Sequence, residues 1–171
     1  MEKERKGSSK KVMVAIDESD FSYNALIWVL DNLKESIKDT SLVIFATQPL
    51  TNFSYPLPAS LGFARFYFPL LPTGDLIKQN QQRTRKVSLG LLEKAKCICA
   101  SYGVNAKTFT EAGDPKEAIC NAVQVHNVNL LVVGDTDKSS GIIKRVLLGS
   151  TLADYCLINT KCPVLVVKKP E

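Results

Sequence analysis

Five short apolar segments recur along the chain, and they constrain the fold more than any other feature of the sequence. They cover residues 11–16, 41–47, 104–110, 129–133 and 162–167. Each is rich in Val, Ile or Leu, or bounded by turn-forming residues, and each is short enough to be a strand. Strands that are apolar at successive positions are typical of a parallel sheet that is buried on both faces.

Between these strands, apolar residues return every three or four positions, which indicates amphipathic helices. Helices are expected from about Ser19 to Leu33, over 75–101, over 116–125 and over 149–159. Asp114 is a suitable helix cap with Pro115 in the first turn, and Gly103 ends the long second helix. Trp28, in the first helix, is expected to pack in the core.

The alternation of strands and helices predicts an α/β protein, a single doubly wound domain with a five-stranded parallel sheet and helices on both faces. A chain of 171 residues, 45% of them hydrophobic, has the usual size and composition of one domain. We expect residues 1–9 to form a solvated tail and residues 10–171 to form the domain.

Composition argues against several classes of function. No apolar run approaches the roughly 20 residues of a membrane-spanning helix, and the charged start lacks a secretion signal. The net charge of +5 comes largely from the two ends and from residues 83–86, without the aromatic interleaving of a nucleic-acid surface. Five cysteines and a single histidine show no zinc-type spacing. We therefore expect a cytoplasmic protein with reduced thiols, no transmembrane segment and no nucleic-acid partner.

Catalytic motifs are missing from the sequence. It contains neither the Gly-x-Ser-x-Gly turn of a hydrolase nor the Walker pattern of a phosphate-binding loop. The only histidine, His126, falls near a helix end on the amino side of the sheet, so it is expected to be a helix-terminus residue. The chain is not expected to be an enzyme, although slow ATP hydrolysis stays open.

The expected ligand site lies at one edge of the sheet. In open parallel sheets, ligands bind beyond the carboxyl ends of the strands, where the strand order reverses. The segments that follow strands in this chain are 17–19, 46–49, 111–114 and 134–141. Binding residues should therefore come from these segments.

Five segments, in the expected order, resemble the universal stress protein family, especially its plant members. They are VMVAIDESDFSYNAL, FATQPL, EAGDPKEAI, LLVVGD and LLGSTLADYCLINTKCPVLVVK, and together they span about residues 10–169. The resemblance implies the strand order 3-2-1-4-5. It also implies a homodimer that pairs through the last strand, at Val164, Leu165, Val166 and Val167. The alternative is an edge that the nearby lysines, Lys161, Lys168 and Lys169, protect from pairing.

The resemblance further implies a site for an adenine nucleotide. Asp17 matches the family residue that contacts the sugar side of the nucleotide, and its alternative role is to cap the first helix. Ala46 and Thr47 match the end of the second strand, where family members hold adenine through backbone groups. Ala15 and Ile16 are expected to form an apolar floor for the base.

The phosphate half of the site departs from the family pattern of Gly, two residues, Gly, nine residues, Gly and then Ser or Thr. Asp137 occupies the second glycine position, and eleven residues separate it from Gly149. Glycines let backbone N–H groups approach phosphate oxygens, whereas a carboxylate repels them. The expected phosphate-binding residues are Gly134, Lys138, Gly141, Gly149, Ser150 and Thr151. AMP is thus easier to accommodate than ATP, with any Mg²⁺ bound through the phosphates; the alternative for 135–141 is a polar surface loop.

A second function stays open. The chain would then be a nucleotide-free dimeric interaction protein, or a chaperone-like protein, that uses an aromatic loop at 53–71. The aromatic residues of this loop are Phe53, Tyr55, Phe63, Phe66, Tyr67 and Phe68. Six aromatic side chains in one loop would form either a self-packed flap, a lid over a ligand or a surface for a partner.

Overall fold

The computed structural model describes residues 10–38, 40–48, 74–135 and 151–168. Five strands are present in this part of the chain: β1 (Lys11–Ile16), β2 (Ser41–Gln48), β3 (Ala106–Ala112), β4 (Leu130–Gly134) and β5 (Val164–Val167). The helices described are α1 (Asp20–Asn32), α2 (Lys34–Lys38), α3 (Gly74–Ser101), α4 (Pro115–Val125) and α6 (Leu152–Asn159).

The strands form one parallel sheet in the order β3-β2-β1-β4-β5. β1 lies in the centre, with Ile16 opposite Ala46 of β2 and Val14 opposite Val132 of β4. The chain therefore adds β2 and β3 on one side of β1, and then β4 and β5 on the other side. This arrangement confirms the predicted α/β class, the parallel sheet and the strand order, and it places the reversal point between β1 and β4.

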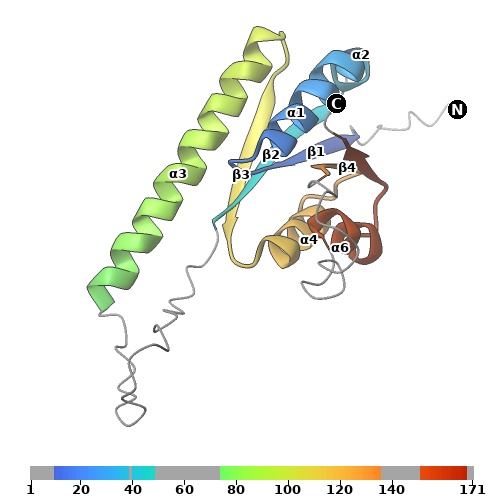
Figure 1. The fold of residues 1–171 in the computed structure, drawn as a ribbon. Helices are drawn as coiled ribbons and strands as arrows, with labels where there is room; N and C mark the ends of the chain where they lie inside the picture. Colours follow the sequence, from blue (N-terminus) through green and yellow to red (C-terminus); the bar gives the residue numbers. More distant parts are fainter. Residues whose placement is uncertain (1–9, 39, 49–73, 136–150, 169–171) are drawn as a thin grey trace, which may run out of the picture.

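Successive residues of each central strand belong to different hydrophobic clusters. Helices α1 and α3 lie on one side of the sheet, and α4 and α6 lie on the other (Figure 1). On one face, Val14 and Ile44 pack with Leu26 of α1 and Leu92 of α3. On the other face, the side chains that pack with α4 and α6 include Met13, Phe45, Leu131 and Val133. The double covering explains why the strands are apolar at successive positions, since neither face of the sheet meets water.

Side-chain caps fix where the helices begin at the carboxyl edge of the sheet. Ser19 is the N-cap of α1, and Asp114 caps α4 by accepting hydrogen bonds from the backbone N–H groups of Lys116 and Glu117, at 2.9 and 3.4 Å. Pro115 stands in the first turn, as predicted. A cap of this kind contributes about 1 kcal/mol to the helix that it opens.

The third strand begins two residues later than the sequence indicated. Gly103 takes a positive φ of +73°, and the N–H of Val104 donates to the carbonyl of Cys99 at 2.9 Å. This bond closes the end of α3 in a glycine-terminated motif. Val104 is therefore buried as part of the helix end, and the sheet begins only at Ala106.

Two further predictions about α1 and α6 need correction. Trp28 is 37% exposed, because the buried stripe of α1 runs through Ala25, Leu26, Val29 and Leu30, so its expected place in the core is wrong. The last helix begins at Leu152 behind its N-cap Thr151, later than the predicted start at residue 149.

All five cysteines are free thiols. Cys97 is exposed on α3, whereas Cys99 and Cys156 are fully buried. Burial raises the pKa of the Cys99 thiol to about 11 and that of Cys156 to about 12. Among the described segments, no helix is long and apolar enough to cross a membrane.

Candidate functional site

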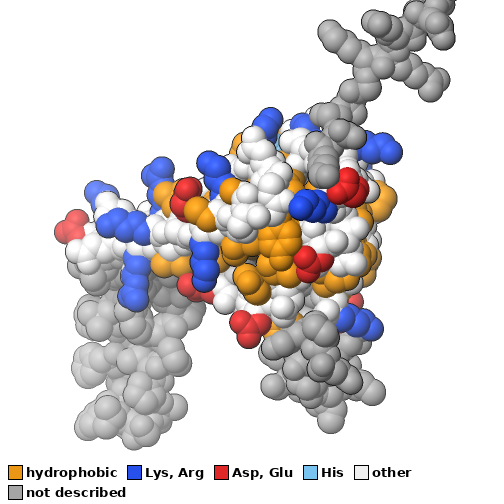
Figure 2. All heavy atoms as spheres, turned by 90° about the horizontal axis from the view of Figure 1, so that it is seen from above, with side chains coloured by type: hydrophobic (Ala, Val, Ile, Leu, Met, Phe, Trp, Pro, Cys, Tyr) orange, Lys and Arg blue, Asp and Glu red, His pale blue; other side chains and the backbone are white. Residues whose placement is uncertain are grey.

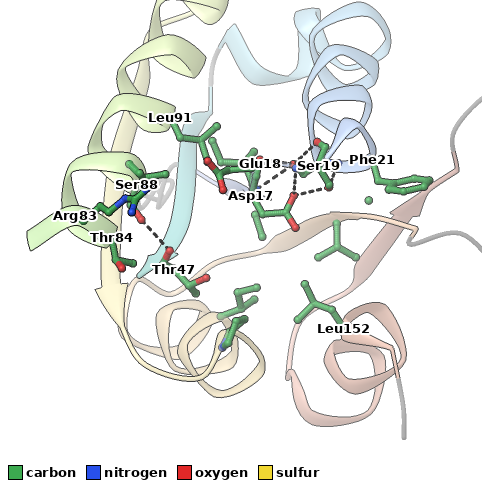
Figure 3. A pocket seen from close by; sticks show the side chains of 18 of the residues that line it. Asp17, Glu18, Ser19, Phe21, Thr47, Arg83, Thr84, Ser88, Leu91 and Leu152 are labelled. Atoms are coloured by element: carbon green, nitrogen blue, oxygen red, sulfur yellow. Dashed lines mark hydrogen bonds between the residues drawn. The ribbon is translucent and has the colours of Figure 1, made fainter. Parts of the chain in front are cut away.

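A cavity of about 630 Å³ opens beside the carboxyl ends of β1, β2 and β4, where the strand order reverses. It lies between the first turn of α1, the middle of α3 and the start of α4 and α6 (Figure 3). A volume of this size is typical of a small-molecule site. The position is the one that parallel sheets of this kind use for ligands.

Asp17 stands at the rim of the cavity with its carboxylate fixed in place (Figure 3). One carboxylate oxygen accepts hydrogen bonds from both the backbone N–H, at 3.0 Å, and the hydroxyl of Ser19. Burial raises the pKa of Asp17 and is the largest single influence on it, but the hydrogen bonds with Ser19 and Ser22 together bring that pKa below its usual value. Asp17 is thus an ionised, oriented acceptor.

Ser22 braces the backbone of the same turn. Its hydroxyl donates to the carbonyl of Asp17 at 3.0 Å, and its oxygen accepts from the N–H of Asp17, also at 3.0 Å. Ser19 caps α1. The predicted alternative role of Asp17 as the cap is therefore wrong, because Asp17 orients the capping residue Ser19 instead.

The floor of the cavity is apolar. Ala15 and Ile16 of β1 line it, as predicted, together with Val133 of β4 and Ile119 of α4. Leu152, the first residue of α6, closes the far side (Figure 3). A planar, apolar group of a ligand can rest on this floor, while its polar atoms face the rim.

One wall of the cavity comes from α3, and the sequence did not indicate it. Asn80, Arg83, Thr84 and Ser88 line the cavity from this helix. Ser88 is only 4% exposed, and its hydroxyl donates to the carbonyl of Thr47 at 3.0 Å, which ties α3 to the end of β2 (Figure 3). The spacing of these residues, about one turn of helix apart, is the signal that could have found them.

Arg83 is the only charged donor that the described residues bring to this cavity. All the described Lys and Arg side chains of α3 are exposed, Arg83 included, but the others do not line this cavity (Figure 2). Among the residues described, no hydrogen bond or ion pair of Arg83 is found. Its guanidinium group therefore offers donors to whatever enters the cavity.

The structure places only some of the predicted binding residues at the cavity. Ala15, Ile16, Asp17, Thr47 and Gly134 line it. Ala46, 1% exposed, lies beneath the surface, and Thr151 is the N-cap of α6 and does not line the cavity. The other predicted phosphate-binding residues lie outside the described residues: Lys138, Gly141, Gly149 and Ser150. The same is true of the aromatic loop at 53–71.

Gly134 has a packing role that the sequence did not reveal. A Cβ atom at this position would lie 2.5 Å from the carbonyl oxygen of Phe21 and 2.9 Å from the backbone nitrogen of Ser22. Both are backbone atoms, which cannot move aside as a flexible side chain can. Glycine is thus required at the end of β4 because the first turn of α1 passes directly over it.

The amino end of α6 is partly satisfied by its own side chains. The hydroxyl of Thr151 accepts from the N–H of Asp154 at 3.1 Å, and the carboxylate of Asp154 accepts from the N–H of Thr151 at 3.4 Å. This capping box places a negative charge at the end of the helix that attracts anions. No group of three acidic, His or Cys side chains that could hold a metal is found among the described residues.

His126 lies away from the cavity, as predicted. It is the C-cap of α4, its ring stacks on Phe109 with 4.1 Å between the ring centroids, and its carbonyl accepts from the side chain of Lys11 at 2.7 Å. Lys11 is the first residue of β1, so these contacts lie at the amino edge of the sheet. His126 cannot reach a ligand at the opposite edge.

Comparisons with known proteins agree with this architecture. The model of the universal stress protein family matches residues 8–168. Universal stress protein YxiE of Bacillus subtilis is 30% identical over 164 residues, which cover 92% of this chain and 98% of that protein.

Two solved structures share the fold and were determined with adenine nucleotides. A universal stress protein family protein from Arabidopsis thaliana with AMP bound has a TM-score of 0.64 and 23% identity, covering 94% of this chain and 92% of its own. A universal stress protein in complex with cAMP has a TM-score of 0.60 and 18% identity, and the match covers 92% of this chain and 96% of that protein's chain. At these identities the likeness shows the fold.

Proposed function

Because the chain belongs to the universal stress protein family, we propose that it is a binding module for an adenine nucleotide, AMP in the first instance, at the cavity beside Asp17. The observation that carries the proposal is the oriented, ionised carboxylate of Asp17 above an apolar floor, at the reversal point of the sheet. The AMP and cAMP bound to two structural neighbours support the same class of ligand.

Each part of the nucleotide has a matching part of the cavity. The hydroxyl groups of a ribose can donate to the carboxylate of Asp17, which accepts hydrogen bonds and cannot give them. The base would lie over Ala15 and Ile16, near the end of β2 at Thr47. The phosphate would then point toward Gly134 and the start of α6.

The start of α6 favours one phosphate over three. In the capping box, the N–H groups of Thr151 and Asp154 already donate to side-chain oxygens, and Asp154 places a carboxylate at the amino end of α6. A longer polyphosphate would bring more negative charge toward Asp154, and like charges repel strongly at short range. We therefore propose AMP ahead of ATP, and any Mg²⁺ would be held mainly by the phosphates of the nucleotide.

We also propose that the module is a homodimer. β5 is an edge strand, and Val164, Leu165 and Val166 keep part of their apolar surface exposed. Pairing with the same strand of a second copy would cover it. The free thiols suit a cytoplasmic module, and we propose a role in binding and signalling in stress response without catalysis.

The test is calorimetric titration of nucleotide-stripped protein with AMP, ADP and ATP, with and without Mg²⁺. The Asp17→Asn variant should bind AMP roughly 10- to 100-fold more weakly, because asparagine has no charge and only one acceptor oxygen, which the hydrogen bonds from Ser19 would occupy. Asp31→Asn is the matched control, since Asp31 is exposed in the last turn of α1 and does not line the cavity. If the wild-type protein binds none of the three nucleotides, the proposal fails and the nucleotide-free interaction protein becomes the better hypothesis.

A further inference from the structure

Two hydroxyl groups of α3 face the cavity one helical turn apart, from Thr84 and Ser88 (Figure 3). Each already donates its only hydrogen to a backbone carbonyl. Thr84 donates to the carbonyl of Asn80 and Ser88 to that of Thr47, both at 3.0 Å. In both bonds the hydroxyl group is the donor and a backbone carbonyl is the acceptor. Both hydroxyl groups therefore have the same remaining hydrogen-bonding capacity.

A hydroxyl group carries one hydrogen and two acceptor lone pairs. With the hydrogen committed, the oxygen can only accept a hydrogen bond from a ligand. Ser88 has little freedom to do otherwise, because it is 4% exposed and its bond anchors α3 to the end of β2. Turning its hydrogen toward a ligand would break that bond in a buried position, which is unfavourable.

The hydroxyl groups of Thr84 and Ser88 therefore favour a ligand group that donates a hydrogen bond. Arg83 on the same helix has donors to offer, but its side chain is exposed, whereas Ser88 is buried. Among purine bases, adenine carries an amino group, a donor, where guanine and hypoxanthine carry a carbonyl oxygen, an acceptor. Resting on the proposed adenine-nucleotide function, we infer that Ser88, assisted by Thr84, selects a purine with an amino group at position 6 over a 6-oxo purine.

The test compares AMP with inosine monophosphate, which carries an oxo group in place of the amino group and a hydrogen on the neighbouring ring nitrogen N1. Calorimetry of the full chain gives the ratio of the two dissociation constants for each variant. The wild-type protein should prefer AMP by about 10-fold, the value of one well-formed hydrogen bond. Ser88→Ala should bring the ratio to within about 3-fold of one, and Thr84→Val should lower it by about 2-fold.

Ser101→Ala is the control, since Ser101 also donates from α3 to a backbone carbonyl, that of Ile98 at 2.7 Å, but lies outside the cavity. In Ser101→Ala, the ratio of the dissociation constants for AMP and inosine monophosphate should stay at the wild-type value. An unchanged ratio in both Ser88→Ala and Thr84→Val, with AMP still bound, would overturn the inference and leave the proposed function standing. Binding of neither nucleotide by the wild-type protein would overturn both.

Discussion

The two sides of the candidate site use their polar groups in different ways: α3 lines the cavity itself, whereas the cap of α6 flanks Leu152, which lines it. At the α3 end, Thr84 and Ser88 donate to the backbone and keep acceptor capacity toward the cavity, while Arg83 has donors to offer. At the α6 end, Gly134 is packed beneath α1, and Thr151 and Asp154 satisfy one another. The first end is equipped to recognise a ligand, whereas the described groups of the second are mostly used by the fold itself.

This difference bears on the meaning of the glycine at the end of β4. The sequence suggested that Gly134 lets a phosphate approach the backbone. The close approach found in the structure is that of Phe21 and Ser22 in α1. A phosphate role and a packing role predict different results for the same substitution, so the two can be separated.

Gly134→Ala should have the largest effect on the protein. The added methyl group would overlap backbone atoms of α1, and overpacking of this kind destabilises by about 3 kcal/mol. Urea unfolding followed by circular dichroism measures the change. The control is Gly90→Ala, on the exposed side of α3 with nothing near its Cβ, which should stabilise by about 0.5 to 1 kcal/mol. Wild-type stability in Gly134→Ala, with only AMP affinity reduced, would show that the glycine serves the ligand.

Asp154→Asn should have a smaller effect, on ligand preference instead of stability. Asparagine can still accept from the N–H of Thr151, so the capping box survives while the negative charge is removed. The ratio of ATP affinity to AMP affinity should rise by about 3-fold, because the longer phosphate chain gains more from losing a like charge. Asp31→Asn removes a charge from the last turn of α1 and leaves the start of α6 intact, so it should leave the ratio unchanged. A fall in the ratio for Asp154→Asn would show that Asp154 helps to bind ATP, for example through a cation.

The contrast between the two ends also explains what could be predicted from the sequence. The periodicity of apolar residues is local and repeated, and it was sufficient to predict the parallel sheet and its helices, whereas the strand order came from the resemblance to the family. Asp17, Ala15 and Ile16 were found because they lie at the end of the first strand, next to the reversal point.

The residues that were missed depend on contacts between distant segments. Ser88 looks like any polar residue of an amphipathic helix until α3 is placed against Thr47, 41 residues earlier in the chain. The packing role of Gly134 depends likewise on where α1 crosses β4. The capping box of Thr151 and Asp154 is different, because a Thr followed three residues later by an acid is a local signal that could have been used.

Arg83→Gln should have the smallest effect, and it tests which part of the nucleotide lies at the α3 end. If the base lies there, Arg83 contacts the ring and not the phosphate, so AMP and adenosine should lose affinity equally, by about 2- to 3-fold. Arg85→Gln is the control, since Arg85 is exposed on the same helix and does not line this cavity. A loss confined to AMP would mean that the phosphate lies beside α3. That result would reverse the assignment of the two ends, because the groups at the start of α6 would then face the base.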